Sequence, residues 1–197
     1  MYGKKLMIFE KALLIALSIT LIAAAWAQKK QTEISSNLIR LHVLAVSDDT
    51  LEQEIKLEVR DAVTDYLAPM LEGAGSSADA RGIIAENMDG IEQAAKSASR
   101  GRDVTVTLSR EYYPTREYES FTLPAGEYES LRVILGEGRG HNWWCVVFPP
   151  LCLNSADSER LRGVMDEDEY GIITEQSGYV LRFRILELWG ELAEKFG

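Results

Sequence analysis

An uncharged apolar run near the start of the chain limits what its first thirty residues can become. The run, ALLIALSITLIAAAWA, covers residues 12–27, and three lysines, Lys4, Lys5 and Lys11, precede it. A helix that spans a bilayer needs about 20 apolar residues, and this run is shorter. A basic start followed by a short apolar stretch is typical of a secretory signal. The sequence therefore predicts that the chain is exported.

The end of the apolar run has the form of a cleavage site. Ala25 and Ala27 flank Trp26 in the small-x-small pattern, so we expect cleavage after Ala27 and a signal peptide over residues 1–27. The alternative is an uncleaved anchor with Lys29 and Lys30 at the outer interface. Residues 28–37 are polar and are predicted to form a short tether. We expect residues 38–197 to form a single domain.

The charge balance excludes two classes of partner. Among 197 residues, 21 are Lys or Arg and 31 are Asp or Glu, which gives a formal net charge of −10. No surplus of basic side chains is available to displace counterions from nucleic acid phosphates. The acidic balance also disfavours docking on an anionic membrane, so membrane contact is expected only through the leader. Nothing in the composition calls for a cofactor or a metal ion to complete the fold.

Hydrophobic periodicity predicts the elements of the domain. Residues 38–46 form an apolar, strand-like run. A helical stripe over residues 51–67 is expected to end at Pro69, and a second helix covers residues 78–98. Period-two segments follow between residues 104 and 148. The runs at 131–135 and 143–148 flank a glycine-rich loop and predict a hairpin.

The last forty residues contain a polar segment and one more helical stripe. The acidic run Asp166–Glu169 is expected to be a solvated face rather than a catalytic carboxylate pair. Residues 181–196 carry apolar side chains at helical spacing. The predicted fold is α+β: an antiparallel sheet with two helices after the first strand and a C-terminal amphipathic helix, preceded by the signal sequence.

The stretch GRGHNWWCVVFPPLC, residues 138–152, carries the most unusual chemistry. Cys145 could act as a nucleophile with His141 or His42, which would make the chain a secreted cell-wall or peptide hydrolase. Both cysteines and both histidines could instead bind zinc, although the spacing fits no common zinc motif. In an exported chain, however, Cys145 and Cys152 are candidates for a disulfide, worth roughly 2–3 kcal/mol for so short a loop.

A recognition surface is the remaining interpretation of this stretch. On a strand, Trp143 and Trp144 point to opposite faces, so that one can be buried while the other anchors a partner. Arg40 and His42 also share one face of the first predicted strand. We therefore predict a partner-binding surface that comprises His141, Asn142, Trp143, Trp144, Arg40 and His42.

Two segments resemble a known family. IRLHVLAVSDDTLEQEIKLEVRDAV (residues 39–63) and GEGRGHNWWCVVFPPLC (residues 136–152) are similar to stage II sporulation protein R of endospore-forming bacteria. The second segment is very specific, and the resemblance covers the element order over residues 38–192.

The resemblance implies a signalling protein with no catalytic site of its own. Members of that family are made in the forespore and exported to the space between the forespore and mother-cell membranes. There they trigger a membrane-embedded aspartic protease of the mother cell, which then cuts the precursor of a sigma factor. The expected partner is therefore that protease, and the disulfide would hold the base of the loop in shape.

Overall fold

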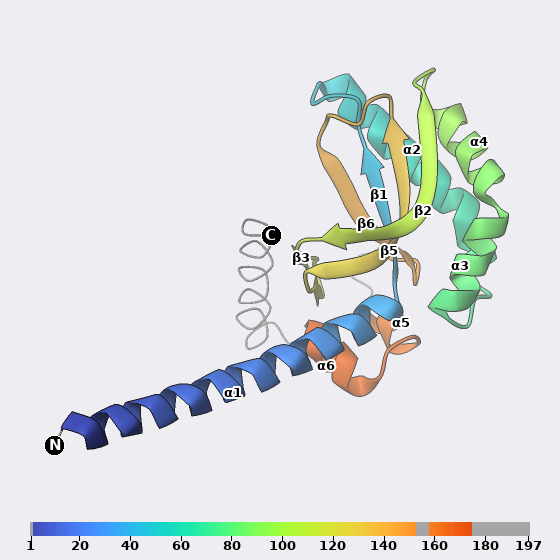
Figure 1. The fold of residues 1–197 in the computed structure, drawn as a ribbon. Helices are drawn as coiled ribbons and strands as arrows, with labels where there is room; N and C mark the ends of the chain where they lie inside the picture. Colours follow the sequence, from blue (N-terminus) through green and yellow to red (C-terminus); the bar gives the residue numbers. More distant parts are fainter. Residues whose placement is uncertain (1, 153–157, 175–197) are drawn as a thin grey trace.

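The protein is built on a mixed four-stranded sheet, β2-β5-β1-β6, in a computed structural model that describes residues 2–152 and 158–174 (Figure 1). A separate two-stranded piece, β3-β4, lies beside it. The elements are α1 (Tyr2–Ser36), β1 (Ile39–Leu44), α2 (Thr50–Leu71), α3 (Ser77–Glu86), α4 (Met88–Ala98), β2 (Val104–Tyr113), β3 (Arg116–Glu117), β4 (Thr122–Leu123), β5 (Gly126–Leu135), β6 (Asn142–Phe148), α5 (Glu159–Arg162) and α6 (Glu167–Thr174).

The central position of β1 corrects two predictions. All six residues of β1 are buried, and the strand lies in the interior of the sheet between β5 and β6. It pairs in parallel with β5 and antiparallel with β6, so the sheet is mixed rather than antiparallel. The predicted β5–β6 hairpin is therefore wrong. The connection between them instead crosses the end of β1, over two strand spacings of about 4.8 Å each.

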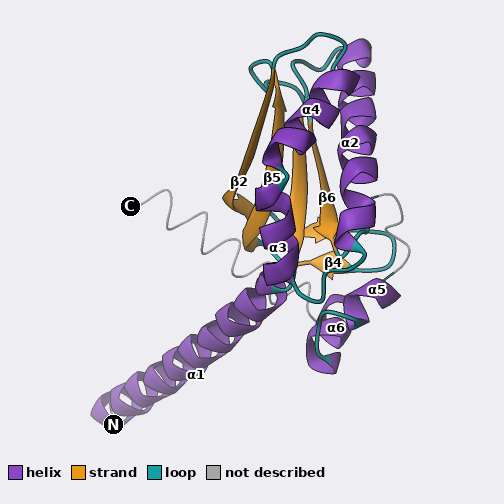
Figure 2. Ribbon diagram, turned by 90° about the vertical axis from the view of Figure 1, so that its right-hand side faces the viewer, coloured by secondary structure: helices purple, strands orange, loops and turns teal. Residues whose placement is uncertain are grey.

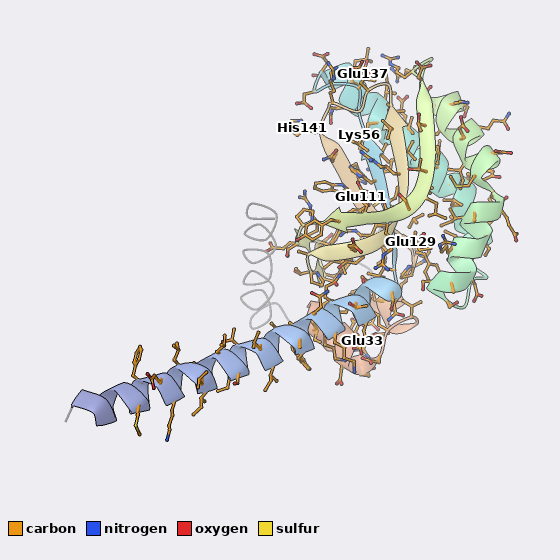
Figure 3. The ribbon with its side chains drawn as sticks, in the orientation of Figure 1. Glu33, Lys56, Glu111, Glu129, Glu137 and His141 are labelled. Carbon is orange, nitrogen blue, oxygen red and sulfur yellow. A yellow bond between two sulfur atoms is a disulfide. The ribbon has the colours of Figure 1, made fainter. Side chains whose placement is uncertain are left out.

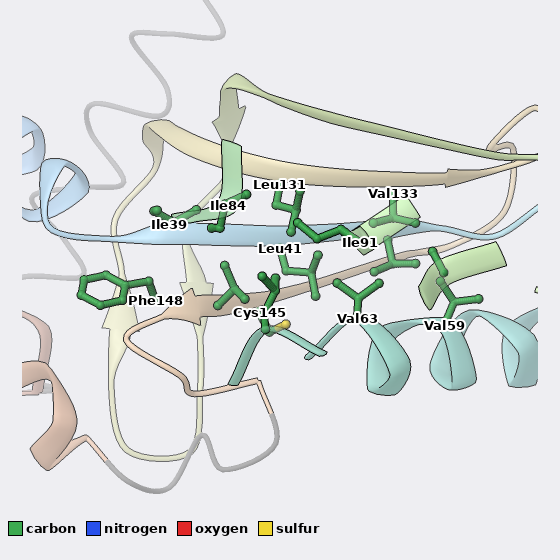
Figure 4. Close-up of a cluster of buried hydrophobic side chains, with 14 of the residues drawn as sticks. Ile39, Leu41, Val59, Val63, Ile84, Ile91, Leu131, Val133, Cys145 and Phe148 are labelled. Carbon is green, nitrogen blue, oxygen red and sulfur yellow. The ribbon is translucent and has the colours of Figure 1, made fainter. Parts of the chain in front are cut away.

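One face of the sheet is covered by helices α2, α3 and α4 (Figure 2). Alternate residues of β1 point into this layer and meet the apolar stripe of α2, with Leu41, Val59 and Val63 fully buried (Figure 4). The stripe of α2 is the one that the four-residue spacing predicted, except that Leu51, its first member, is 48% exposed.

Two helix boundaries differ from the prediction. Pro69 removes one backbone donor, but α2 continues past it to Leu71, whose side chain is 2% exposed and packs in the core. The predicted helix over residues 78–98 is two helices that meet at Asn87. The side chain of Asn87 donates to the carbonyl oxygen of Ile83 at 2.8 Å and competes with the helical backbone.

The lower half of the other face carries a second core. Tyr113, Phe121 and Tyr128 are at most 1% exposed there, beneath β3-β4 and next to the end of α1 and helix α6. The upper half of this face bears no helical layer among the described residues (Figures 1 and 2). Polar side chains on this face therefore sit between a packed aromatic core and an open stretch of sheet.

Helix α1 projects from the domain, and its last turns are part of the fold (Figure 1). Residues 28–37 were predicted to be a tether, but residues 28–36 continue the helix, and Gln31 and Ile34 pack against the domain with exposures of 5% and 0%. The section from Phe9 onward is long and apolar enough to cross a membrane, a property that signal sequences share. Of the predicted cleavage residues, Ala25 is exposed and Ala27 is 6% exposed.

The acidic run near residue 167 is a helix start rather than a wholly solvated face. The backbone N–H of Glu169 donates to Asp166, and that of Asp166 donates to Glu169, at 2.7 and 3.0 Å, which is a capping box. Glu169 also accepts a hydrogen bond from Asn37 and is 5% exposed. The predicted helix over residues 181–196 lies outside the described residues.

Candidate functional site

The loop between β5 and β6, residues 136–141, is held tightly over the end of β1. The N–H of Gly140 donates to the carbonyl oxygen of Ala45 at 2.9 Å. A side chain at Gly140 would overlap the carbonyl group of Ser47, which explains why the loop needs glycine there. We call this segment the β5–β6 loop; it lies at the end of the sheet opposite α1 (Figure 3).

Two charged side chains anchor the C-terminal end of the β5–β6 loop. The carboxylate of Asp48 accepts a hydrogen bond from the backbone N–H of His141 and lies 2.6 Å from its ring nitrogen Nδ1. Lys56, on α2, donates from Nζ to the carbonyl oxygen of His141 at 3.1 Å and to Gln53 at 2.5 Å. Lys56 is 5% exposed, and burial lowers the pKa of its ammonium group.

This anchoring leaves two of the six predicted contact residues, His141 and Asn142, on the surface. The side chain of His141 is 76% exposed, and Asn142 at the start of β6 is also exposed. Because its backbone is fixed on both sides by Asp48 and Lys56, the His141 ring projects from a rigid support. A preorganised surface group of this kind loses little entropy when it binds a partner.

The two tryptophans point to opposite faces of the sheet, as their spacing predicts. Trp143 packs against the core under α2, and Trp144 packs against the second core. Both are half-buried, so neither fits the prediction of one core and one exposed ring. Each is instead covered by an arginine: Arg60 lies 4.4 Å from the Trp143 ring centroid, and Arg116 lies 3.7 Å from that of Trp144.

Arg40 and His42 share a face of β1 as predicted, but they are buried. Arg40 is 0% exposed, and its guanidinium lies 4.0 Å from the Tyr113 ring centroid and donates to the hydroxyl of Tyr118 at 2.6 Å. His42 is 5% exposed and bonds through Nδ1 to Glu111 at 2.9 Å. In this conformation Arg40 has no surface with which to touch a partner.

Burial and hydrogen bonding together set the ionisation of Glu111. Burial alone would raise the pKa of this carboxyl group. Hydrogen bonds from His42 and Ser130 and the charge of Arg132 outweigh that effect, so the pKa of Glu111 lies below its ordinary value. Glu111 is therefore a carboxylate at neutral pH, placed among basic side chains.

The two cysteines form a disulfide that closes the other end of β6. Their Cα atoms are 5.0 Å apart, and the N–H of Leu151 donates to the carbonyl oxygen of Val146 at 3.1 Å inside the ring. Cys145 is 3% exposed and belongs to the core under the helices. The disulfide thus ties the turn after β6 to the main core.

This arrangement does not assemble a cysteine-dependent catalytic site. The sulfur of Cys145 is in a disulfide and faces the helices, whereas His42 lies on the opposite face of the sheet next to Trp144. His141 pairs with Asp48 at the surface. Within residues 2–152 and 158–174, no three His, Cys, Asp or Glu side chains gather as a metal site would require.

Sequence reasoning missed several residues that shape this region. Asp48 carried no sequence signal for anchoring the loop, and Lys56 lies among the apolar positions of α2 without a sequence signal for burial. Arg60 and Arg116 also gave no signal, because their stacking partners come from a different part of the chain. Only the density of glycine, histidine and tryptophan in residues 136–144 marked the site.

Comparisons with known proteins identify relatives of this chain. The family model described as stage II sporulation protein R matches residues 35–158. Stage II sporulation protein R of Bacillus subtilis (strain 168) is 34% identical over 150 residues, which cover 72% of this chain and 67% of that protein. No solved structure matches the chain. The matched region holds the whole sheet, the β5–β6 loop and the disulfide, and the chain belongs to the stage II sporulation protein R family.

Proposed function

We propose that this chain is an exported intercellular signal that activates a membrane-embedded aspartic protease of the mother cell. Activation of this protease would lead to processing of the mother-cell sigma-factor precursor during sporulation. Membership of a sporulation family and the apolar N-terminal helix support this proposal. Residues 1–27 act as signal peptide or anchor, and residues 38–197 act as a single signalling domain in the space between the forespore and mother-cell membranes.

The observation that carries this proposal is the fixed presentation of His141 and Asn142. Both are exposed, while the backbone beneath them is held by hydrogen bonds to Asp48, Lys56 and Ala45. An activator must bind the active state of its receptor more tightly than the inactive state. A rigid group that fits only one receptor state supplies such a difference in affinity between the two states.

The test is alanine substitution at His141, Asn142, Trp143 and Trp144, scored by protease-dependent cleavage of the precursor. At least one substitution should raise the concentration needed for half-maximal activation by about 30-fold, as expected for a residue worth about 2 kcal/mol at an interface. Full activity in all four variants would remove this surface as the site of action.

Gln93→Ala provides the matched control. Gln93 is an exposed polar residue on α4, on the helical layer of the sheet. Its substitution should leave activation unchanged. Each variant is also compared with the unaltered chain for export and for urea unfolding, so that loss of the fold is separated from loss of contact.

A further inference from the structure

A group of basic side chains lies on the sheet face that α2, α3 and α4 do not cover. His42 bonds to Glu111, and Arg132 lies 3.8 Å from the same carboxylate. On the other side, the His42 ring lies 5.5 Å from Trp144, which Arg116 covers. Arg40 lies behind them on β1. We call Arg40, His42, Arg116 and Arg132 the basic cluster; Glu111 marks its place on the sheet in Figure 3.

The basic cluster has more charge than its acidic partner can balance. Glu111 is the one carboxylate that the described part of the chain brings into contact with the cluster. Its oxygens already accept hydrogen bonds from His42 and Ser130. The cluster thus contains three guanidinium groups and an imidazole but one carboxylate, which His42 and Arg132 contact, in a chain whose formal net charge is −10. The local charge is opposite to that of the whole molecule.

The cluster also holds arginine N–H donors that no acceptor in residues 2–152 and 158–174 satisfies. Nε of Arg116, Nε of Arg132, and Nε and one terminal nitrogen of Arg40 are buried without a hydrogen-bond partner among the described residues. An unsatisfied buried polar group costs about 1–3 kcal/mol, and more if it is charged. Native structures rarely leave several such groups side by side. Their concentration at one place points to an acceptor that arrives from outside.

The positions of the two outer arginines make the cluster accessible. The side chain of Arg132 is 38% exposed, and Arg116 is half-buried at the rim beside Trp144. Burial lowers the pKa of Arg116; the nearby Tyr118 opposes this shift, and the charge of Arg40 adds to it. A carboxylate that binds between Arg116 and Arg132 would favour their charged forms. Arg40 would act from the layer beneath, through its charge.

The neighbouring strand edge favours a polypeptide as the source of that carboxylate. Strand β6 is at the edge of the sheet, and the carbonyl oxygen of Trp144 accepts a long hydrogen bond of 3.4 Å from the Tyr118 hydroxyl. An extended segment can therefore contact backbone at β6 while its acidic side chain reaches the arginines. Arginine binds carboxylates in bidentate geometry, which suits this role.

We propose that the basic cluster binds a carboxylate side chain on an acidic segment of the protein partner, with Arg116 and Arg132 making the direct contacts. This inference rests on the proposed function, because it specifies the chemistry of that partner's contact surface. It adds a second contact region, with Arg116 from β3 and Arg132 from β5, beside the edge strand that begins at Asn142.

The first test measures binding without activation. The full chain, held in neutral-lipid nanodiscs, is titrated with hexaglutamate while the arginine Nε–H signals are followed by NMR. The signals of Arg116 and Arg132 should shift and saturate, and Arg116→Gln should abolish saturation. Arg110 is the control, because it is 62% exposed on β2 and paired with Glu127. Equal, non-saturating shifts at Arg110 and in the cluster would overturn the proposal.

The second test uses protease activation. Arg116→Gln and Arg132→Gln should each raise the half-maximal concentration by about tenfold and weaken its dependence on salt, while Arg110→Gln should change neither. Wild-type potency and salt dependence in both cluster variants would overturn the proposal. If hexaglutamate binds but the unaltered chain activates nothing, the proposed function fails and the acidic-ligand site stands. If phosphatidylglycerol nanodiscs shift the arginine signals and hexaglutamate does not, the proposal is overturned and the ligand of the cluster is an anionic membrane surface.

Discussion

Substitution of Gly140 by alanine tests whether the β5–β6 loop must lie tightly on the end of β1. The added Cβ would overlap the carbonyl oxygen of Ser47, and it would lie 2.6 Å from the carbonyl carbon and 3.0 Å from the Cβ of Ala45. The first obstacle is backbone, which cannot rotate away as a side chain could. The loop must therefore lift off.

The cost follows from the hydrogen bonds that lifting breaks. The bond from the N–H of Gly140 to Ala45 contributes about 1 kcal/mol, and the bond from the N–H of His141 to the Asp48 carboxylate contributes about 1.5–3 kcal/mol. Restricting the unfolded chain by replacing glycine returns about 0.4–1 kcal/mol. Gly140→Ala should therefore lower the free energy of unfolding by about 2–3 kcal/mol.

The assay is urea unfolding followed by circular dichroism, together with precursor cleavage. Gly82→Ala is the matched control, since a side chain at this exposed position inside α3 would meet nothing within 4 Å. It should raise stability by about 0.5–1 kcal/mol and leave activation unchanged. If Gly140→Ala is as stable and as active as the unaltered chain, the tight contact between loop and strand is not what holds His141 in place.

Three further predictions concern the disulfide, Glu111 and Lys56. Replacing Cys145 and Cys152 together by serine should lower the free energy of unfolding by roughly 2–3 kcal/mol, measured by urea titration, while retained activation would agree with a non-catalytic role. Glu111→Gln should destabilise the protein at pH 7. Because folding lowers the pKa of Glu111, the difference in unfolding free energy between the variant and the unaltered chain should shrink as the pH falls below about 4. A difference that stays constant with pH would contradict this. Lys56→Met should change the free energy of unfolding by less than about 1 kcal/mol, because removing a buried charge offsets the loss of its hydrogen bonds. The substitution should nevertheless weaken activation, because it releases the backbone of His141. Unchanged activation would show that Lys56 is dispensable for the loop.

Local pattern predicted the elements of this protein better than their arrangement. The spacing of apolar residues identified α2, and alternation identified β2, because both depend on neighbours within one element. The pairing of β1 with β5 and β6 depends on contacts about 90 and 100 residues away along the chain, which periodicity does not encode. The glycine-rich loop suggested a hairpin, but β1 pairs between β5 and β6, so the loop spans a strand instead.

At the candidate site, too, local pattern predicted some features, and contacts between distant segments determined the others. The density of glycine, histidine and tryptophan marked the β5–β6 loop, and alternation placed Trp143 and Trp144 on opposite faces. Arg40 was predicted to belong to the contact surface because alternation places it on one strand face with His42, yet the aromatic rings of Tyr113 and Tyr128 enclose it. A cation between aromatic rings requires three separate segments to meet, and no local pattern signals that.

The most direct measurement of the central claim is co-expression of three components in a host that does not sporulate. These are this chain, the candidate membrane protease and the sigma-factor precursor, with the chain supplied with and without residues 1–27. The account predicts that the precursor is cleaved only when the chain is exported, and that His141→Ala or Trp144→Ala reduces cleavage in an otherwise folded protein. Cleavage that proceeds equally without the chain, or with the chain retained in the cytoplasm, would contradict it.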